Sequence, residues 1–192
     1  MIIAISGKAG SGKDTLGDII KKLINDNSIE VVQFSGSIKK IAHILLGKGS
    51  CGDNVYSREF KDNLLSKYSF SMDSHYTRCS TGRDFYKKMA DFYKLLLGSR
   101  IFIHILFRDY KTDDKWIITD VRYKNEVEAI KDMGGIVIRI NRDSVVPVNH
   151  ESEYELDDYE FDYVVENNST IDDLKKEADK ALKILKQNHA IN

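Results

Sequence analysis

The sequence predicts a doubly wound α/β domain, in which a five-stranded parallel sheet is flanked by helices. Five short apolar runs predict the strands, and they alternate with segments that have the hydrophobic spacing of helices. The first run, residues 2–5, leads through a glycine-rich turn into a helix that opens at Lys13. Ligands of such sheets bind at the carboxyl ends of the strands, so we expect one site there.

The turn after the first strand has the pattern of a phosphate-binding loop. Residues 7–15 read Gly-Lys-Ala-Gly-Ser-Gly-Lys-Asp-Thr, between a predicted strand and a predicted helix. Its glycines let amide hydrogens turn inward, and the helix start adds partial positive charge. A plain surface turn would not require this spacing and context. The motif predicts a P-loop NTPase fold, with phosphates bound by Gly10, Ser11, Gly12, Lys13, Asp14 and Thr15.

The residue after the loop lysine departs from the usual pattern, which has Ser or Thr there to hold Mg²⁺. Asp14 takes that place and Thr15 follows, in a Gly-Lys-X-Thr form that resembles nucleoside monophosphate kinases. We therefore expect Thr15 to supply the hydroxyl on the metal side. Two roles stay open for Asp14: an outer-shell carboxylate, or a first-turn acid that favours the helix dipole.

The middle of the chain predicts a helical insertion, at about residues 38–111. A second strand at 30–34 and the turn Ser35-Gly36-Ser37 precede a helix at 38–46. A turn-rich loop at 47–57 follows, and two further helices are predicted at 83–97 and 99–110. This is too long for a simple crossover, and such insertions are usually functional.

The last third of the chain restores the sheet. Strands are predicted at 115–120, 136–140 and 161–165, with a helix at 124–133 after the first of them. A capped amphipathic helix runs to about Gln187. The polar stretch at about 141–158 contains His150 and Glu153, and it predicts a lid over the phosphates. The whole of 1–192 is expected to be a single domain.

Charged residues at the predicted strand ends are the candidates for catalysis. Asp120 ends an apolar strand, where a carboxylate can hold Mg²⁺; a simple helix cap is the alternative. Arg122 and Arg142 follow two strand ends, and guanidinium groups can grip phosphate oxygens. Arg122 also precedes Glu126 by four residues, so a weak surface ion pair is the plainer explanation for it.

Composition and charge exclude several classes. A net charge of −1 is not the excess positive charge that is typical of proteins that bind nucleic acid or an anionic membrane. No apolar run is long enough to span a bilayer. Two cysteines without metal-ligand spacing predict neither a zinc site nor a disulfide framework. Because Met1 leads directly into a core strand, we expect no targeting segment and a cytoplasmic protein. A homodimer is left open.

Several motifs together resemble the deoxynucleoside monophosphate kinases of tailed bacteriophages. They are the loop at 7–15, residues 34–39, Thr81-Gly82-Arg83, Asp-Val-Arg-Tyr-Lys-Asn-Glu at 120–126, Gly134-Gly135 and His-Glu-Ser-Glu at 150–153. The resemblance implies phosphoryl transfer from ATP with Mg²⁺, small-molecule nucleotides being the partners. It points to Gly10, Gly12, Lys13 and Thr15 for ATP, and to Lys39, Arg83 and Arg122 for the acceptor. With the strand-end positions added, we expect catalysis by Lys13, Asp120, Arg122 and Arg142 and metal binding by Thr15 and Asp120. Substrate binding is also expected of Ser37, Glu126, His150 and Glu153, and a phage-encoded protein would be in the host cytoplasm.

Two other functions are weighed. The same architecture could phosphorylate another small phosphorylated acceptor, of the dephospho-coenzyme A or phosphomevalonate type. A nucleotide-dependent switch is the alternative outside enzymes, but the sequence has no Asn-Lys-x-Asp string for reading a guanine base.

Overall fold

The parallel sheet of the computed structural model is the frame that positions the site. The structure describes residues 1–46, 81–145 and 151–187. Five strands pair in the order β2-β3-β1-β4-β5, and every pairing is parallel. Their bounds are β1 Ile2–Ser6, β2 Ile29–Val32, β3 Lys115–Val121, β4 Ile136–Asn141 and β5 Tyr163–Glu166. The predicted fold class is therefore confirmed.

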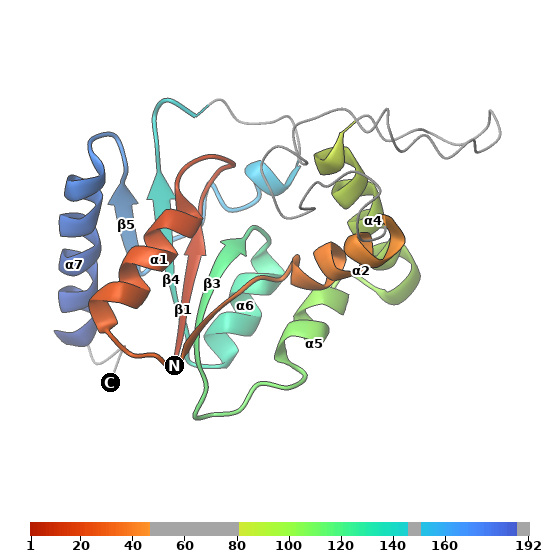
Figure 1. Ribbon diagram of the computed structural model, residues 1–192, viewed down its shortest axis with the longest axis horizontal. Helices are drawn as coiled ribbons and strands as arrows, with labels where there is room; N and C mark the ends of the chain where they lie inside the picture. The colour runs from red at the N-terminus through yellow and green to blue at the C-terminus, as the bar shows by residue number, and fades with distance from the viewer. Residues whose placement is uncertain (47–80, 146–150, 188–192) are drawn as a thin grey trace. The chain divides into compact units, whose positions relative to one another are not determined.

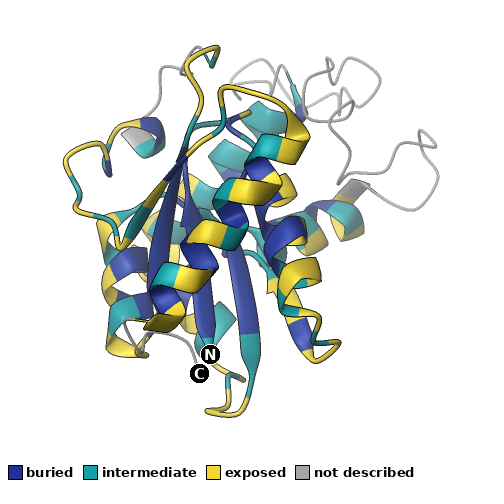
Figure 2. Ribbon diagram, turned by 90° about the vertical axis from the view of Figure 1, so that its left-hand side faces the viewer, coloured by how far each residue is buried: buried dark blue, intermediate teal, exposed yellow. Residues whose placement is uncertain are grey.

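Helices cover both faces of this sheet (Figure 1). Helices α1 (Lys13–Ile24) and α7 (Ile171–Gln187) pack on one face, and α6 (Lys124–Asp132) lies on the opposite face. Leu16 and Ile20 of α1 meet Ile138 of β4 and Ala178 of α7 in the main core. The central strands are buried along most of their length, as Figure 2 shows. Such apolar runs form parallel strands because both faces are covered.

The chain divides into two compact units, Met1–Phe34 with Leu106–Asn192, and Ser35–Ile105. The first unit contains the whole sheet. The described helices of the second are α2 (Gly36–Leu46), α4 (Gly82–Leu97) and most of α5 (Ile101–Phe107). Thr81 caps the start of α4, since its hydroxyl accepts a hydrogen bond from the amide of Asp84 at 3.1 Å. The predicted turn-rich loop at 47–57 lies outside the described residues.

Element boundaries differ from the predictions where side chains take over backbone hydrogen bonds. Strand β2 ends at Val32 instead of residue 34, because the Phe34 amide donates to the Asp120 carboxylate at 2.8 Å. Strand β5 begins at Tyr163 instead of residue 161, because Asp162 bonds to Val137 through both its amide and its carboxylate. Helix α5 is shorter than the predicted 99–110, and turn hydrogen bonds follow it.

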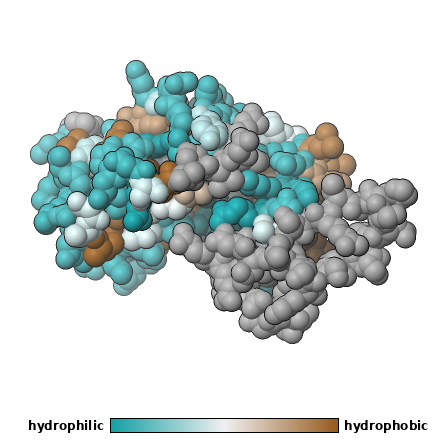
Figure 3. Space-filling model, turned by 90° about the horizontal axis from the view of Figure 1, so that it is seen from above, coloured by the Kyte–Doolittle hydropathy of each residue, from teal (hydrophilic) through white to brown (hydrophobic). Residues whose placement is uncertain are grey.

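The carboxyl ends of three neighbouring strands bring distant parts of the chain together. Ser6, the last residue of β1, pairs with Val121 of β3 and with Arg139 of β4. The glycine loop therefore begins beside Arg122 and near the end of β4. Figure 3, which views the molecule from this end, shows mostly hydrophilic residues over the described part of the face. No helix in the described ranges is long and apolar enough to cross a membrane.

Candidate functional site

The glycine loop has the conformation that its sequence predicts. Gly10 and Gly12 have φ angles of 87° and 103°, in the left-handed region that favours glycine. A Cβ atom on Gly12 would also lie 2.6 Å from the side-chain nitrogen of Asn167. That nitrogen donates to the Ser11 carbonyl at 2.8 Å, so Asn167, which follows β5, holds the loop in place. Sequence reasoning missed Asn167, which has no motif of its own.

Lys13 lies across the loop that precedes it. Its ammonium group donates to the carbonyl oxygens of Gly7 and Lys8, at 2.7 Å each, and the residue is only 9% exposed. Burial, together with the positive charge of Arg122, lowers the pKa of Lys13 to about 8. A partly desolvated ammonium group at a glycine-rich loop is suited to an anion.

Glu153 brings a carboxylate to the same loop from the connection between β4 and β5. One oxygen accepts from the Ala9 amide at 2.7 Å, and the other forms an ion pair with the Arg122 guanidinium. Burial pushes the pKa of Glu153 upward, but Arg122, the Ala9 amide and Lys13 outweigh it and hold that pKa below its ordinary value. The pairing therefore stabilises the fold at neutral pH, and this stabilisation is lost as pH falls and the carboxylate is protonated.

Glu126 holds the backbone of Arg122 in place. Its carboxylate accepts from the amides of Arg122 and Tyr123, at 2.7 and 3.1 Å, and the residue is buried at the start of α6. The Arg122 guanidinium pairs with Glu153, while Glu126 engages the Arg122 amide. The binding of substrate by Glu126 stays a prediction.

The Asp14 carboxylate links α1 to two strand ends. It accepts from the hydroxyl of Thr119 at 2.8 Å and from the side chain of Gln33 at 3.1 Å. Gln33 also donates to Thr119, so the three side chains form a closed network next to Asp120. Sequence reasoning considered a metal and the helix dipole for Asp14, and it could not foresee partners that lie 19 and 105 positions away.

The metal-side candidates supply oxygen donors. The Asp120 carboxylate is partly buried and accepts from the Phe34 amide, while Thr15 is exposed in the first turn of α1. Across the three described ranges, no group of three or more His, Cys, Asp or Glu side chains is arranged to hold a metal ion. A hydroxyl and one carboxylate fit the mode in which Mg²⁺ keeps most of its water and binds substrate phosphates.

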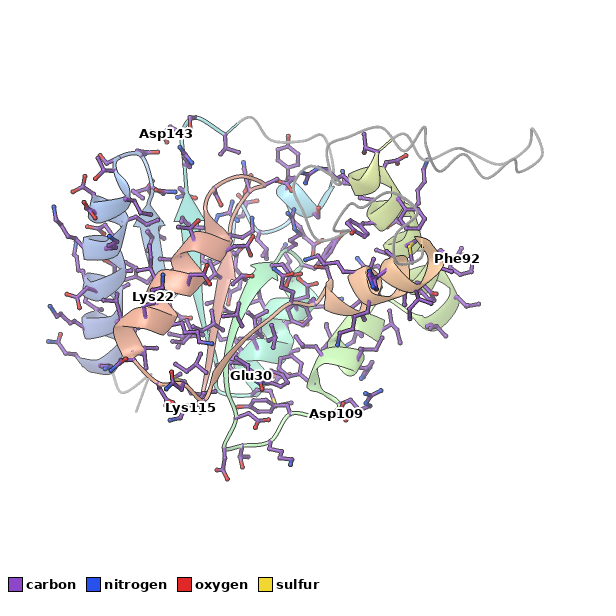
Figure 4. All side chains as sticks on the ribbon, in the orientation of Figure 1. Lys22, Glu30, Phe92, Asp109, Lys115 and Asp143 are labelled. Atoms are coloured by element: carbon purple, nitrogen blue, oxygen red, sulfur yellow. The ribbon has the colours of Figure 1, made fainter. Side chains whose placement is uncertain are left out.

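A cavity of about 460 Å³ opens beside the loop at the carboxyl end of β4. Lys8 and Ser11 line it from the loop, Asn141 and Arg142 from the end of β4, and Tyr159 from the connection to β5. Arg142 is exposed at this cavity. Asp143, labelled in Figure 4, lies above the end of β4 and also lines it. A volume of this size suits a small organic ligand.

Arg139 of β4, which also lines that cavity, holds the connection between β4 and β5 in place. It is buried, pairs with Asp157 at 2.8 Å, and lies 5.4 Å from the centre of the Phe161 ring. Asp157 also pairs with Lys8 of the glycine loop, at 3.1 Å. The segment that carries Glu153 is thus tied to the loop and to the sheet.

The remaining predicted acceptor residues belong to the second unit or lie outside the described residues. Ser37 and Lys39 are in the first turns of α2, and Arg83 is in the first turn of α4. Their binding of an acceptor stays a prediction. His150 lies outside the described residues.

Comparisons with known proteins give a family match and a similar fold. Residues 97–178 match the family model described as deoxynucleotide monophosphate kinase. The chain is 26% identical over 181 residues to a candidate deoxynucleotide monophosphate kinase of Acanthamoeba polyphaga mimivirus, which covers 90% of this chain and 91% of that protein.

A solved structure supports the fold. The shikimate kinase of Aquifex aeolicus superposes with a TM-score of 0.54 at 15% identity, and each chain is covered completely. At this identity the likeness concerns the fold alone. The matches together confirm the resemblance to deoxynucleotide monophosphate kinases, and they support a kinase built on the P-loop kinase fold.

Proposed function

We propose that this protein transfers a phosphoryl group from ATP to deoxynucleoside 5′-monophosphates. The observation that carries the proposal is the convergence of the Ala9 amide and the Arg122 guanidinium on one carboxylate, with the Lys13 ammonium beside the same loop. Groups arranged in this way also suit a phosphate. The family match favours a deoxynucleotide as acceptor.

The glycine loop would hold the outer phosphates of ATP, and the cavity at the end of β4 would receive its nucleoside. Arg142, at the edge of that cavity, would contact the donor. Thr15 and Asp120 would hold Mg²⁺, which would neutralise part of the phosphate charge when bound. Arg122 would contact the acceptor, and the binding of the acceptor by Ser37, Lys39 and Arg83 stays a prediction.

The chemistry requires no general base. A nucleoside monophosphate is already an oxyanion near neutral pH, because its second pKa is about 6. The protein's task is to align the two phosphates and to compensate the charge that develops on the transferred group. Lys13 and Arg122 supply positive charge at the loop, and water must be excluded to prevent hydrolysis of ATP.

The test measures ADP release from ATP with each deoxy- and ribonucleoside monophosphate in turn. Dephospho-coenzyme A and phosphomevalonate extend the set to the other acceptor types. We expect rapid release only with one or more deoxynucleoside monophosphates. A rate that does not depend on the acceptor would contradict the proposal and indicate a hydrolase or switch.

The pH dependence of the reaction should reflect the ionisation of the Lys13 ammonium group. We expect kcat/KM for ATP to fall as pH rises through about 8, because the ammonium is present below this pKa and is lost above it. The Lys13→Arg variant should lose this falling limb, since a guanidinium stays charged. A limb that persists unchanged in that variant would assign the ionisation to another group.

A further inference from the structure

The phosphate-binding loop contacts an acid of its own chain. Glu153 reaches it from 144 positions away, and its side chain is only 4% exposed. We propose that the Glu153 carboxylate occupies the phosphate site of the nucleotide-free protein and must leave the Ala9 amide and Arg122 before a phosphate can bind. This inference rests on the proposed function, since it concerns the same anion site.

The contacts of Glu153 are those that a phosphate would need. One oxygen accepts a hydrogen bond from a loop amide, and the other accepts one from the Arg122 guanidinium. The positive charge of Lys13 also helps to lower the pKa of Glu153. Loop amides and arginine side chains are the groups that proteins use to bind phosphate oxygens. A carboxylate and a phosphate cannot both hold the same amide hydrogen and the same face of Arg122.

The positive charges of the site explain why such a carboxylate is useful. Arg122 lowers the pKa of Lys13 and Glu153 raises it, so the two cations repel each other and the acid offsets this repulsion. In the absence of a nucleotide, the carboxylate keeps Arg122 turned toward the loop. The Ala9 amide and the Arg122 guanidinium would then already be oriented to donate to a phosphate that binds.

The residues that follow Glu153 are anchored, so movement of its side chain is sufficient for the exchange. Leu156 is buried, and Asp157 pairs with both Lys8 and Arg139. A glutamate side chain can rotate away about its own torsions while this turn stays in place. The occupied state reduces the apparent affinity for phosphate, as any competing state does.

Isothermal titration with inorganic pyrophosphate tests this inference in the whole protein. We expect the Glu153→Gln variant to bind pyrophosphate roughly tenfold more tightly than the unaltered protein. The neutral amide forms weaker hydrogen bonds with Arg122 than the carboxylate does, so it competes less with pyrophosphate. Glu153→Asp should also bind more tightly, because the shorter side chain cannot reach both groups although it keeps the charge. Adenosine, which has no phosphate, should bind all variants equally.

Glu160→Gln is the matched control, since Glu160 is an exposed acid of the same connecting segment. Its affinity for pyrophosphate should equal that of the unaltered protein. If Glu153→Gln gains affinity but Glu153→Asp does not, simple charge repulsion explains the gain and the inference is wrong. Unchanged or weaker binding by both Glu153 variants also overturns it, while the proposed function stands. If even the unaltered protein binds neither pyrophosphate nor ATP, the proposed function fails first.

Discussion

Replacing Lys13 with alanine is expected to lower kcat for phosphoryl transfer by at least about a hundredfold, while the fold survives. The side chain lies across the glycine loop, and its ammonium group is nearly enclosed by Gly7 and Lys8. In this position it would neutralise charge that develops on the transferred group. Initial rates of ADP release with the best deoxynucleoside monophosphate measure the effect.

The stability of this variant should not fall with its activity. Burial disfavours the charged form of Lys13, as its lowered pKa of about 8 indicates, and relief of this cost at pH 7 offsets the loss of its hydrogen bonds to Gly7 and Lys8. Lys22→Ala is the matched control, because Lys22 lies on the same helix and is exposed (Figure 4). We expect it to keep normal rates. Near-normal transfer by Lys13→Ala would remove the loop from the proposed mechanism.

The sequence was informative where local chemistry decides the structure. The spacing of Gly10, Gly12 and Lys13 predicted a loop whose glycines do adopt left-handed φ angles before α1. The apolar strands were recognisable because a parallel sheet buries both of its faces. The position of Arg122 at the end of β3 followed from the strand pattern, and the structure brings it next to the glycine loop through Glu153.

The sequence could not reveal the contacts that depend on tertiary register. Asn167 holds the Ser11 carbonyl only because β5 ends beside the loop. The partners of Asp14 are set by how α1 lies over the ends of β2 and β3. A helix-surface ion pair with Glu126 was the plainer alternative for Arg122; in the structure Arg122 precedes α6, and its amide donates to the Glu126 carboxylate.

Replacing Arg122 with methionine is the second change with a large expected effect. We expect kcat/KM for the acceptor to fall roughly a hundredfold or more, because a guanidinium that binds phosphate oxygens is lost. We also expect the free energy of unfolding to fall by about 2 kcal/mol, because Glu153 loses its ion-pair partner while it stays buried. Arg122 is itself 26% exposed, so the full cost of a completely buried pair does not apply.

A double variant separates these two effects. Arg122→Met with Glu153→Gln should recover most of the stability, since no buried carboxylate is left without its cation, but it should not recover turnover. Arg108→Met is the control, because Arg108 forms an exposed pair with Asp109 on the surface. Chemical denaturation and initial rates, measured below the melting temperatures of all variants, give both quantities. If the double variant regains normal transfer, Arg122 serves only to neutralise Glu153, and its assignment to the phosphoryl-transfer site is wrong.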